Sequence, residues 1–289
     1  NAAQENKNSY VVISGIKLGD TSIRATKKLQ KQCSNLVVKN LEQVNFPLAI
    51  NSELHLICRK LDNGGQIAVT LADDEVVHIY SKGIPDSEID DQFAELKGQH
   101  SLGFNVYGSN NQLWKKEIDK LAILVRPDGV HPNLFVWKSQ YLVQTEDKIQ
   151  PKSITQRYPS ILKFGSTFSE LKDDFEESCS PLQIQDSEPW LLNSPKKQFQ
   201  VNCFNYYYLG FPRKIEAVFG DDILQLAWVL SAKPEESRIR KMLVGAFGSH
   251  FEKNEEWESF DNGRVFLRKD KPEVLLISDI LVPFKDKNF

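Results

Sequence analysis

The sequence predicts an α+β fold built by tandem duplication, in which each unit is an antiparallel sheet covered on one face by helices. Three observations lead to this prediction. Landmark residues recur at a nearly constant offset, apolar segments of strand length are joined by short turns, and helical patterns interrupt the strands in the same order twice. Short connections favour antiparallel pairing, because parallel strands need long crossovers.

The duplication is visible in residues of several types. These landmarks pair up along the chain: Cys33 with Cys179, Cys58 with Cys203, Asp73-Asp74 with Asp221-Asp222, Pro85 with Pro234, and Trp114 with Trp257. A length of 289 residues also favours about two domains. We therefore predict one unit over residues 10–152 and another over residues 153–289. Residues 1–9 are expected to form a flexible polar leader, for which a lipid anchor upstream is one hypothesis.

Each unit is expected to begin with a helix. The elements Leu18–Thr21 and Phe164–Thr167 both end in a threonine, whose hydroxyl can accept a hydrogen bond from a free N–H group in the first helical turn. Thr167 and Glu170 also fit a capping box. Apolar residues then recur at spacings of three and four, so each helix should bury one face.

Strands and a second helix are expected after the first helix of each unit. The expected strands are 54–60, 66–70, 76–80, 121–125 and 134–142 in the first unit, and 199–207, 215–219, 223–229, 265–267 and 274–281 in the second. Second helices should start near Pro85 and Pro234. Adjacent aspartates at 73–74 and 221–222 invite an acid and base pair or a metal site. Tight turns are favoured instead, because neighbouring strand residues point to opposite faces and aspartate is common in turns.

The four cysteines form two equivalent pairs. A disulfide is expected within each unit, Cys33 with Cys58 and Cys179 with Cys203, and these bonds would place the protein in the periplasm or outside the cell. The alternative is that all four are reduced and buried. His55 and Cys58 have a spacing that can begin a zinc site, but Gln200 stands at the position that matches His55, so no metal is predicted.

Composition argues against several functions. The formal net charge is −3 and charges of both signs are mixed along the chain, so nucleic-acid binding is not expected. No run reaches the roughly 18 apolar residues of a membrane span. The five histidines are scattered and no catalytic motif is present, so we predict a non-enzymatic protein without a cofactor.

Aromatic residues of the second unit supply the candidate binding surface. Side chains of a regular strand alternate between its two faces, so Phe204, Tyr206 and Tyr208 would share one face. Exposed tyrosines are common at protein interfaces. We therefore predict Tyr206, Tyr208 and Phe211 as partner-binding residues; an equally weighted alternative is that these rings fill a groove between the two units.

A duplicated unit with a glycine-threonine helix start, one cysteine pair and acidic turns resembles a known group. The two elements Leu18–Thr21 and Phe164–Thr167, with the strand-turn-strand segments 69–77 and 217–226, are similar to those of the beta-lactamase inhibitory protein family and the related SmpA-type outer-membrane assembly lipoproteins. This resemblance implies helices packed on an antiparallel sheet, export, and function by protein-protein contact.

These inferences define the expected function. We expect an exported, non-enzymatic protein that docks another cell-envelope protein through a sheet face or the groove between its units. Two alternatives remain at this point. The groove could bind a small ligand or cell-wall fragment, or it could hold the site of a hydrolase.

Overall fold

The computed structural model describes residues 11–90, 94–144, 156–249 and 252–287. The predicted leader and the predicted unit boundary near residue 152 lie outside these residues. By its internal contacts the chain divides into two compact units: unit 1 is Asn1–Gly129 with Trp137–Gln150, and unit 2 is Val130–Val136 with Pro151–Phe289. The crossing segment Val130–Val136 therefore belongs to unit 2, although the chain on both sides of it belongs to unit 1.

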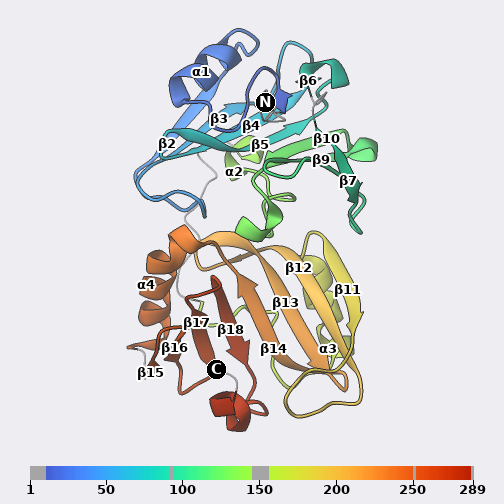
Figure 1. The fold of residues 1–289 in the computed structure, drawn as a ribbon, viewed down its shortest axis with the longest axis vertical. Helices are drawn as coiled ribbons and strands as arrows, with labels where there is room; N and C mark the ends of the chain where they lie inside the picture. Colours follow the sequence, from blue (N-terminus) through green and yellow to red (C-terminus); the bar gives the residue numbers. More distant parts are fainter. Residues whose placement is uncertain (1–10, 91–93, 145–155, 250–251, 288–289) are drawn as a thin grey trace, which may run out of the picture. The chain divides into compact units, whose positions relative to one another are not determined.

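Unit 1 is organised around an eight-stranded antiparallel sheet (Figure 1). From one edge to the other the strands are β2 (Val37–Leu41), β3 (Glu53–Cys58), β4 (Gln66–Ala72), β5 (Glu75–Lys82), β10 (Leu121–Val125), β9 (Gln112–Lys116), β8 (Asn105–Tyr107) and β7 (Leu96–Gln99). A separate two-stranded sheet pairs β1 (Val12–Ile13) with β6 (Ile89–Asp90). The helices are α1 (Ser22–Gln30), α2 (Gln140–Val143), η1 (Asp86–Glu88), η2 (Glu117–Asp119) and η3 (Asp128–Val130).

Unit 2 contains a second eight-stranded antiparallel sheet with the same sequential order of strands across it. Its strands are β11 (Leu182–Ser187), β12 (Gln198–Tyr208), β13 (Phe211–Gly220), β14 (Ile223–Leu230), β18 (Glu273–Ile277), β17 (Val265–Arg268), β16 (Trp257–Phe260) and β15 (Glu252–Lys253). The helices are α3 (Phe168–Ser178), α4 (Glu236–Phe247), η5 (Lys233–Glu235) and η6 (Val282–Lys287). The α+β class predicted from the sequence is confirmed.

Local signals position the first helix of each unit. The hydroxyl of Thr21 accepts a hydrogen bond from the Arg24 N–H, and Thr167 with Glu170 forms a complete capping box. Disulfides then join Cys33, after α1, to Cys58 on β3, and Cys179, after α3, to Cys203 on β12. A capped start and a covalently attached end hold each helix against its sheet.

The acidic pairs are turns, as expected. Asp73, Asp74, Asp221 and Asp222 all have positive φ, which is the geometry of a two-residue hairpin turn between paired strands. The Asp73 carboxylate also accepts hydrogen bonds from three backbone N–H groups of the preceding loop. These carboxylates therefore shape the backbone.

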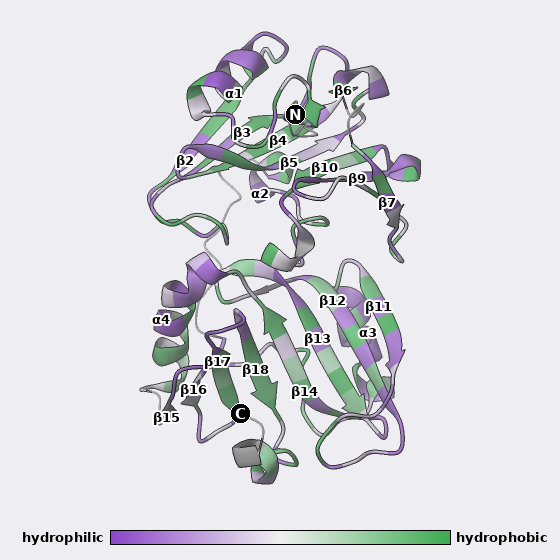
Figure 2. Ribbon diagram, viewed as in Figure 1, coloured by the Kyte–Doolittle hydropathy of each residue, from purple (hydrophilic) through white to green (hydrophobic). Residues whose placement is uncertain are grey.

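Apolar residues lie on both faces of the unit 2 sheet. On one face α3 buries Leu171 and Phe175 in a cluster with Val201 and Phe219. On the other face a separate cluster includes Leu226 and Leu275. Figure 2 shows the central strands of this sheet as largely hydrophobic, whereas the helices carry more hydrophilic residues. A sheet buried on both faces reads as a nearly continuous apolar run, which weakens the alternation that normally reveals strands.

Three sequence predictions about the fold are wrong. Unit 1 has no second long helix among its described residues, because the η1 turn is followed by β6, which pairs with β1. No strand covers residues 134–142, which contain tight turns and α2. Trp114 and Trp257 do not lie on matching strands, since β9 adjoins β10 whereas β16 is separated from β18 by β17.

Candidate functional site

The aromatic strand β12 does not form the predicted binding surface. Tyr206, Tyr208 and Phe211 are all buried, with exposed fractions of 8%, 3% and 4%. The hydroxyl of Tyr206 accepts a hydrogen bond from the Ser160 N–H, and the hydroxyl of Tyr208 donates to the carbonyl oxygen of Arg157. The prediction that these three rings are accessible to a partner is therefore corrected, because they pack inside unit 2.

A β-bulge explains why strand alternation gave the wrong face. Asn205 has φ 58°, and the pairing of β12 with β13 shifts between Cys203 and Tyr206. The additional residue places Cys203 and Tyr206 in the same core cluster, whereas Phe204 packs on the ring of Phe135 at a centroid distance of 5.6 Å. Phe204 therefore does not share a face with Tyr206 and Tyr208.

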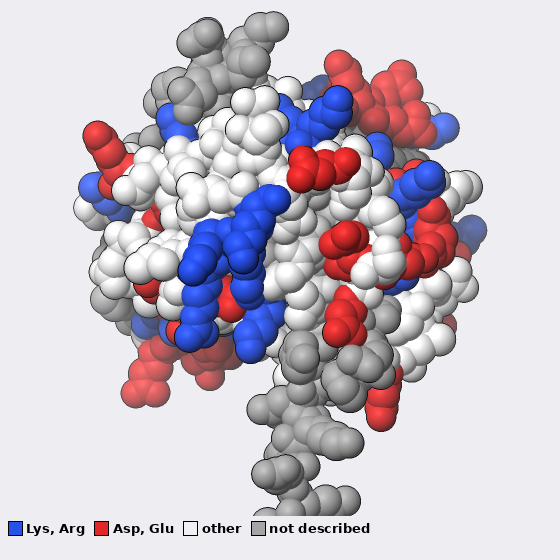
Figure 3. Space-filling model, turned by 90° about the horizontal axis from the view of Figure 1, so that it is seen from above, with Lys and Arg blue, Asp and Glu red and all other residues white. Residues whose placement is uncertain are grey.

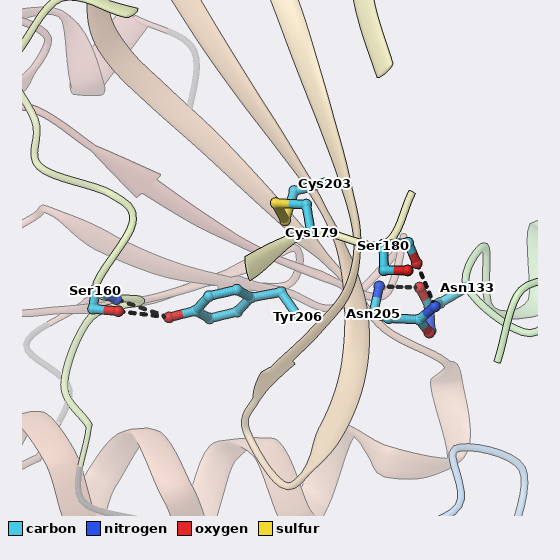
Figure 4. Close-up of a disulfide and its surroundings, with 7 residues drawn as sticks. All are labelled: Asn133, Ser160, Cys179, Ser180, Cys203, Asn205 and Tyr206. Carbon is cyan, nitrogen blue, oxygen red and sulfur yellow. Dashed lines mark hydrogen bonds between the residues drawn. A yellow bond between two sulfur atoms is a disulfide. The ribbon is translucent and has the colours of Figure 1, made fainter. Parts of the chain in front are cut away.

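Asn205 also connects β12 to the crossing segment. The side-chain amide of Asn133 donates to Oδ1 of Asn205 at 2.8 Å, and the Asn205 backbone N–H donates to Oδ1 of Asn133 at 2.8 Å. The Asn205 amide donates in turn to the carbonyl oxygen of Ser180 at 2.6 Å. Figure 4 shows Asn205 directed towards Asn133 and Ser180, and Tyr206 directed the other way towards Ser160. The bulge is thus a fixed attachment point for Val130–Val136.

A buried ion pair lies beside this attachment. The guanidinium group of Arg213 on β13 contacts both carboxylate oxygens of Glu235 at 2.6 and 3.0 Å, and both side chains are almost fully buried. Burial alone would raise the pKa of Glu235, but Arg213, assisted by His131 and the Ala232 N–H, outweighs burial and the pKa lies below its usual value. The Glu235 carboxyl is therefore ionised at neutral pH.

His131 of the crossing segment faces the same pair. Its Nε2 lies 3.9 Å from Glu235 Oε1, and neither ring nitrogen has a hydrogen-bond partner among the described residues. Burial lowers the pKa of His131 to about 4, although the Glu235 carboxylate opposes this shift and Arg213 reinforces it. The imidazole is consequently neutral in the folded protein above that pH.

Acid should weaken the fold through His131. An unfolded histidine has a pKa of about 6.5, so the unfolded chain binds a proton between about pH 6.5 and pH 4 that the folded chain does not. Stability from this group is complete above about pH 6.5 and decreases as the pH falls. Between pH 7 and pH 5 we expect a His131→Gln variant to lose about 2 kcal/mol less unfolding free energy than the wild type, as measured by urea denaturation. Equal losses would show that His131 does not titrate differently on folding.

A second buried polar group lies in unit 1. His55 Nε2 is 2.6 Å from a Glu53 carboxylate oxygen, and His55 Nδ1 is 3.2 Å from the Thr70 hydroxyl. Burial raises the pKa of Glu53, but the hydrogen bond and charge interaction with His55, together with the N–H groups of Asn45 and Phe46, outweigh burial and the pKa lies below its usual value. Thr70, His55 and Glu53 thus follow one another in the order of a hydroxyl nucleophile, a base and an acid in a catalytic triad. However, Thr70 has no exposed surface and the rings of Trp137 and Tyr141 lie over His55, so substrate cannot reach the hydroxyl.

The most accessible candidate site is a cleft in unit 2. It has a volume of about 480 Å³ and is lined by residues from four separate segments of the chain. The apolar lining residues are Leu162, Phe164, Ile223, Ile277 and Ile280, and the polar ones are Tyr158, Asp261, Arg264, Ser278 and Asp279. The loop before α3 thus meets the start of β14 and the end of β18, together with the turn between β16 and β17.

Most ionisable groups of this cleft are paired with one another. The Tyr158 hydroxyl donates a very short hydrogen bond to the Asp261 carboxylate, and Arg264 Nε lies 2.6 Å from an Asp279 oxygen. Burial, followed by the hydrogen bond to Asp261, raises the pKa of Tyr158 above its usual value. The Ser278 hydroxyl is buried and has no hydrogen-bond partner among the described residues. An apolar cleft whose charged groups are paired with one another is suited to binding.

Comparison of the chain with protein-family models, with curated proteins and with solved structures found no match.

Within the described residues, no helix is both long and apolar enough to cross a bilayer. In the same part of the chain, no three His, Cys, Asp or Glu side chains are grouped to hold a metal ion. Cys58, considered with His55 for zinc, is oxidised in its disulfide. The two disulfides fit a protein exported from the reducing cytoplasm.

Proposed function

We propose that this chain is an exported, non-enzymatic binding protein whose unit 2 cleft accepts the apolar part of a small amphipathic ligand, such as a cell-wall fragment. The observation that carries the proposal is the cleft itself. Its volume of about 480 Å³ lies within the roughly 300 to 1,000 Å³ of small-molecule sites, and its lining has the usual composition of apolar surface with a few polar groups.

The arrangement of the polar groups supports binding over catalysis. Asp261 is engaged by Tyr158 and also by Arg157 at 3.1 Å, and Arg264 is engaged by Asp279. Groups that are held in this way orient a ligand more readily than they exchange protons with it. The Asp279 side chain, which is 81% exposed at the cleft, is the group we expect to meet a polar atom of the ligand.

Filling the cleft should abolish binding. Ile280, which is 51% exposed, lines the cleft, so an Ile280→Trp substitution should block it without disturbing the core. We expect this variant to bind the fluorescent apolar anion anilinonaphthalene sulfonate at least tenfold more weakly than the wild type. An Ile118→Trp variant is the matched control, because Ile118 is 88% exposed and lies in unit 1.

A thermal-shift screen should then identify the natural ligand class. Soluble cell-wall fragments at 100 times their dissociation constant should raise the melting temperature of the wild type by roughly 5 to 10 °C, and that of Ile280→Trp by much less. The small-ligand proposal would be abandoned under two joint conditions. The Ile280→Trp variant would have to bind the probe as tightly as the wild type and the Ile118→Trp control do, and no fragment would raise the melting temperature of the wild type.

A second candidate function is docking of another envelope protein at strand β11. This strand is an edge of the unit 2 sheet, Ile184 on it is 53% exposed, and Trp190 shortly after it is 49% exposed. Edge strands can pair with an added strand of a partner. If the cleft screen fails, capture of an envelope protein by the wild type but not by an Ile184→Lys variant would support this candidate.

The ancestry of the chain is part of the proposal. We propose that the two units arose by tandem duplication, that they are related to the beta-lactamase inhibitory protein and SmpA-type group, and that the protein is periplasmic. The shared strand order, the two threonine caps and the two similarly placed disulfides support duplication. A solved structure of either unit that superposed poorly on the other unit would count against it.

A further inference from the structure

The outer faces of α1 and α3 carry opposite charges at matching positions. The third, sixth and tenth residues after the capping residue Thr21 are basic. The third, sixth and tenth residues after the capping residue Thr167 are acidic. We call Arg24, Lys27 and Lys31 the basic stripe, and Glu170, Asp173 and Glu177 the acidic stripe. All six residues are exposed.

Each stripe lies along one side of its helix. Spacings of three and four residues place successive side chains on the same helical face. Figure 3 shows Lys and Arg side chains gathered over the α1 region of the molecular surface. No described residue forms an ion pair with Arg24, Lys27 or Lys31, so these charges are available to a binding partner.

The neighbouring charges follow the same inversion but are already neutralised. Lys28 and Asp174 occupy the seventh position after their caps. Lys28 lies 2.7 Å from Asp20, and Asp174 lies 2.6 Å from Lys163. On α3 the Glu170 carboxylate accepts hydrogen bonds from Thr167 in the capping box, whereas Asp173 and Glu177 form no ion pair with a described residue. The free charge of the acidic stripe therefore lies on Asp173 and Glu177.

We propose that the basic stripe of one copy of this chain binds the acidic stripe of a second copy. Two stripes with equal spacing and opposite sign can align along their whole length. A contact between two identical stripes would bring like charges together, so each contact joins the basic stripe of one copy to the acidic stripe of another. The small formal net charge of −3 leaves little overall repulsion between copies to oppose it.

The association should be weak and strongly dependent on salt. Exposed ion pairs contribute little individually, and their attraction is screened over about 8 Å at physiological ionic strength and about 3 Å at 1 M. Ile23, which is 79% exposed beside the basic stripe, supplies apolar contact that salt does not screen. Copies joined by single contacts keep one stripe free at each end and grow beyond the dimer as concentration rises, whereas two reciprocal contacts close a two-fold dimer.

Charge reversal on each stripe provides the test. In sedimentation velocity, the mean sedimentation coefficient of the wild type should increase with protein concentration at 20 mM salt and stay constant at 500 mM salt. Lys27→Glu/Lys31→Glu and Asp173→Lys/Glu177→Lys variants should each remain monomeric. A mixture of the two variants should associate again. The first variant then carries two acidic stripes and the second carries two basic ones, so each supplies the charge that the other lacks.

A matched variant controls for net charge. Lys97 and Lys241 are exposed and lie outside both stripes, and a Lys97→Glu/Lys241→Glu variant changes the net charge as much as the basic-stripe reversal does. This variant should associate as the wild type does. The proposal is overturned if the wild type stays monomeric at low salt over the full concentration range, or if the mixture of reversed variants does not associate.

Discussion

Replacing Arg213 with Met should lower the free energy of unfolding by about 3 to 5 kcal/mol, because it leaves the Glu235 carboxylate buried without its counterion. Arg213 is 1% exposed. Besides contacting Glu235, it donates through Nε to the Tyr208 carbonyl oxygen and through Nη2 to the Leu209 carbonyl oxygen, both at 2.7 Å. Methionine fills a similar volume but satisfies none of these acceptors. Urea denaturation at pH 7 would measure the loss.

A second substitution tests whether the unpaired charge is the cause. An Arg213→Met/Glu235→Gln double variant removes the buried charge, and its amide can only partly replace the carboxylate as acceptor for the Ala232 N–H. The double variant should therefore be more stable than Arg213→Met alone. A Lys163→Met variant breaks the exposed pair with Asp174 and should cost at most about 1 kcal/mol. The explanation would be contradicted if the double variant lost as much unfolding free energy as the Arg213→Met and Glu235→Gln single variants lose together.

Removing either disulfide should cost about 3 to 4 kcal/mol. The bonds close loops with sequence separations of 25 and 24, and the chain-entropy model gives nearly equal stabilisation for loops of equal length. We expect Cys33→Ser/Cys58→Ser and Cys179→Ser/Cys203→Ser to shift the urea midpoint of the unit concerned by similar amounts. Because each bond joins a helix to a strand in its own unit, only that unit should be affected.

The reduced wild type is the control for the disulfide variants. Adding reductant should destabilise each unit of the wild type and should leave unchanged the unit from which the cysteines have been removed. A loss below about 1 kcal/mol in either double variant would mean that packing of the helix on the sheet, and not the covalent link, determines the stability of that unit.

Features that depend on neighbouring residues were predictable from the sequence. The threonine caps, the aspartate turns and the cysteine pairing all follow from local chemistry or from recurrence along the chain, and the structure contains all three. Local chemistry also predicted α4 after Pro234. It did not predict that the corresponding helix is missing from the described residues of unit 1, where β6 pairs with β1 instead. That outcome depends on a strand far away in the sequence.

The candidate sites were less predictable, for a different physical reason. Asn205, with its positive φ, reversed the facing of every later residue on β12. Asparagine is depleted in strands and tolerates positive φ, so Asn205 was a local signal, but its position alone does not distinguish a bulge from a regular strand residue. The cleft residues come from separated segments and include no motif. The charge stripes, by contrast, are readable from the sequence once the two helices are aligned on their caps.

The crossing segment has a consequence for how this protein is synthesised. Val130–Val136 leaves the ribosome with the end of unit 1, but its partner Asn205 lies 72 positions further along the chain than Asn133. At about 5 to 20 residues per second, the segment waits roughly 4 to 14 s before that partner exists. During that interval the ring of Phe135 lacks the contact with Phe204 that it makes in the folded protein, because Phe204 has not yet been synthesised.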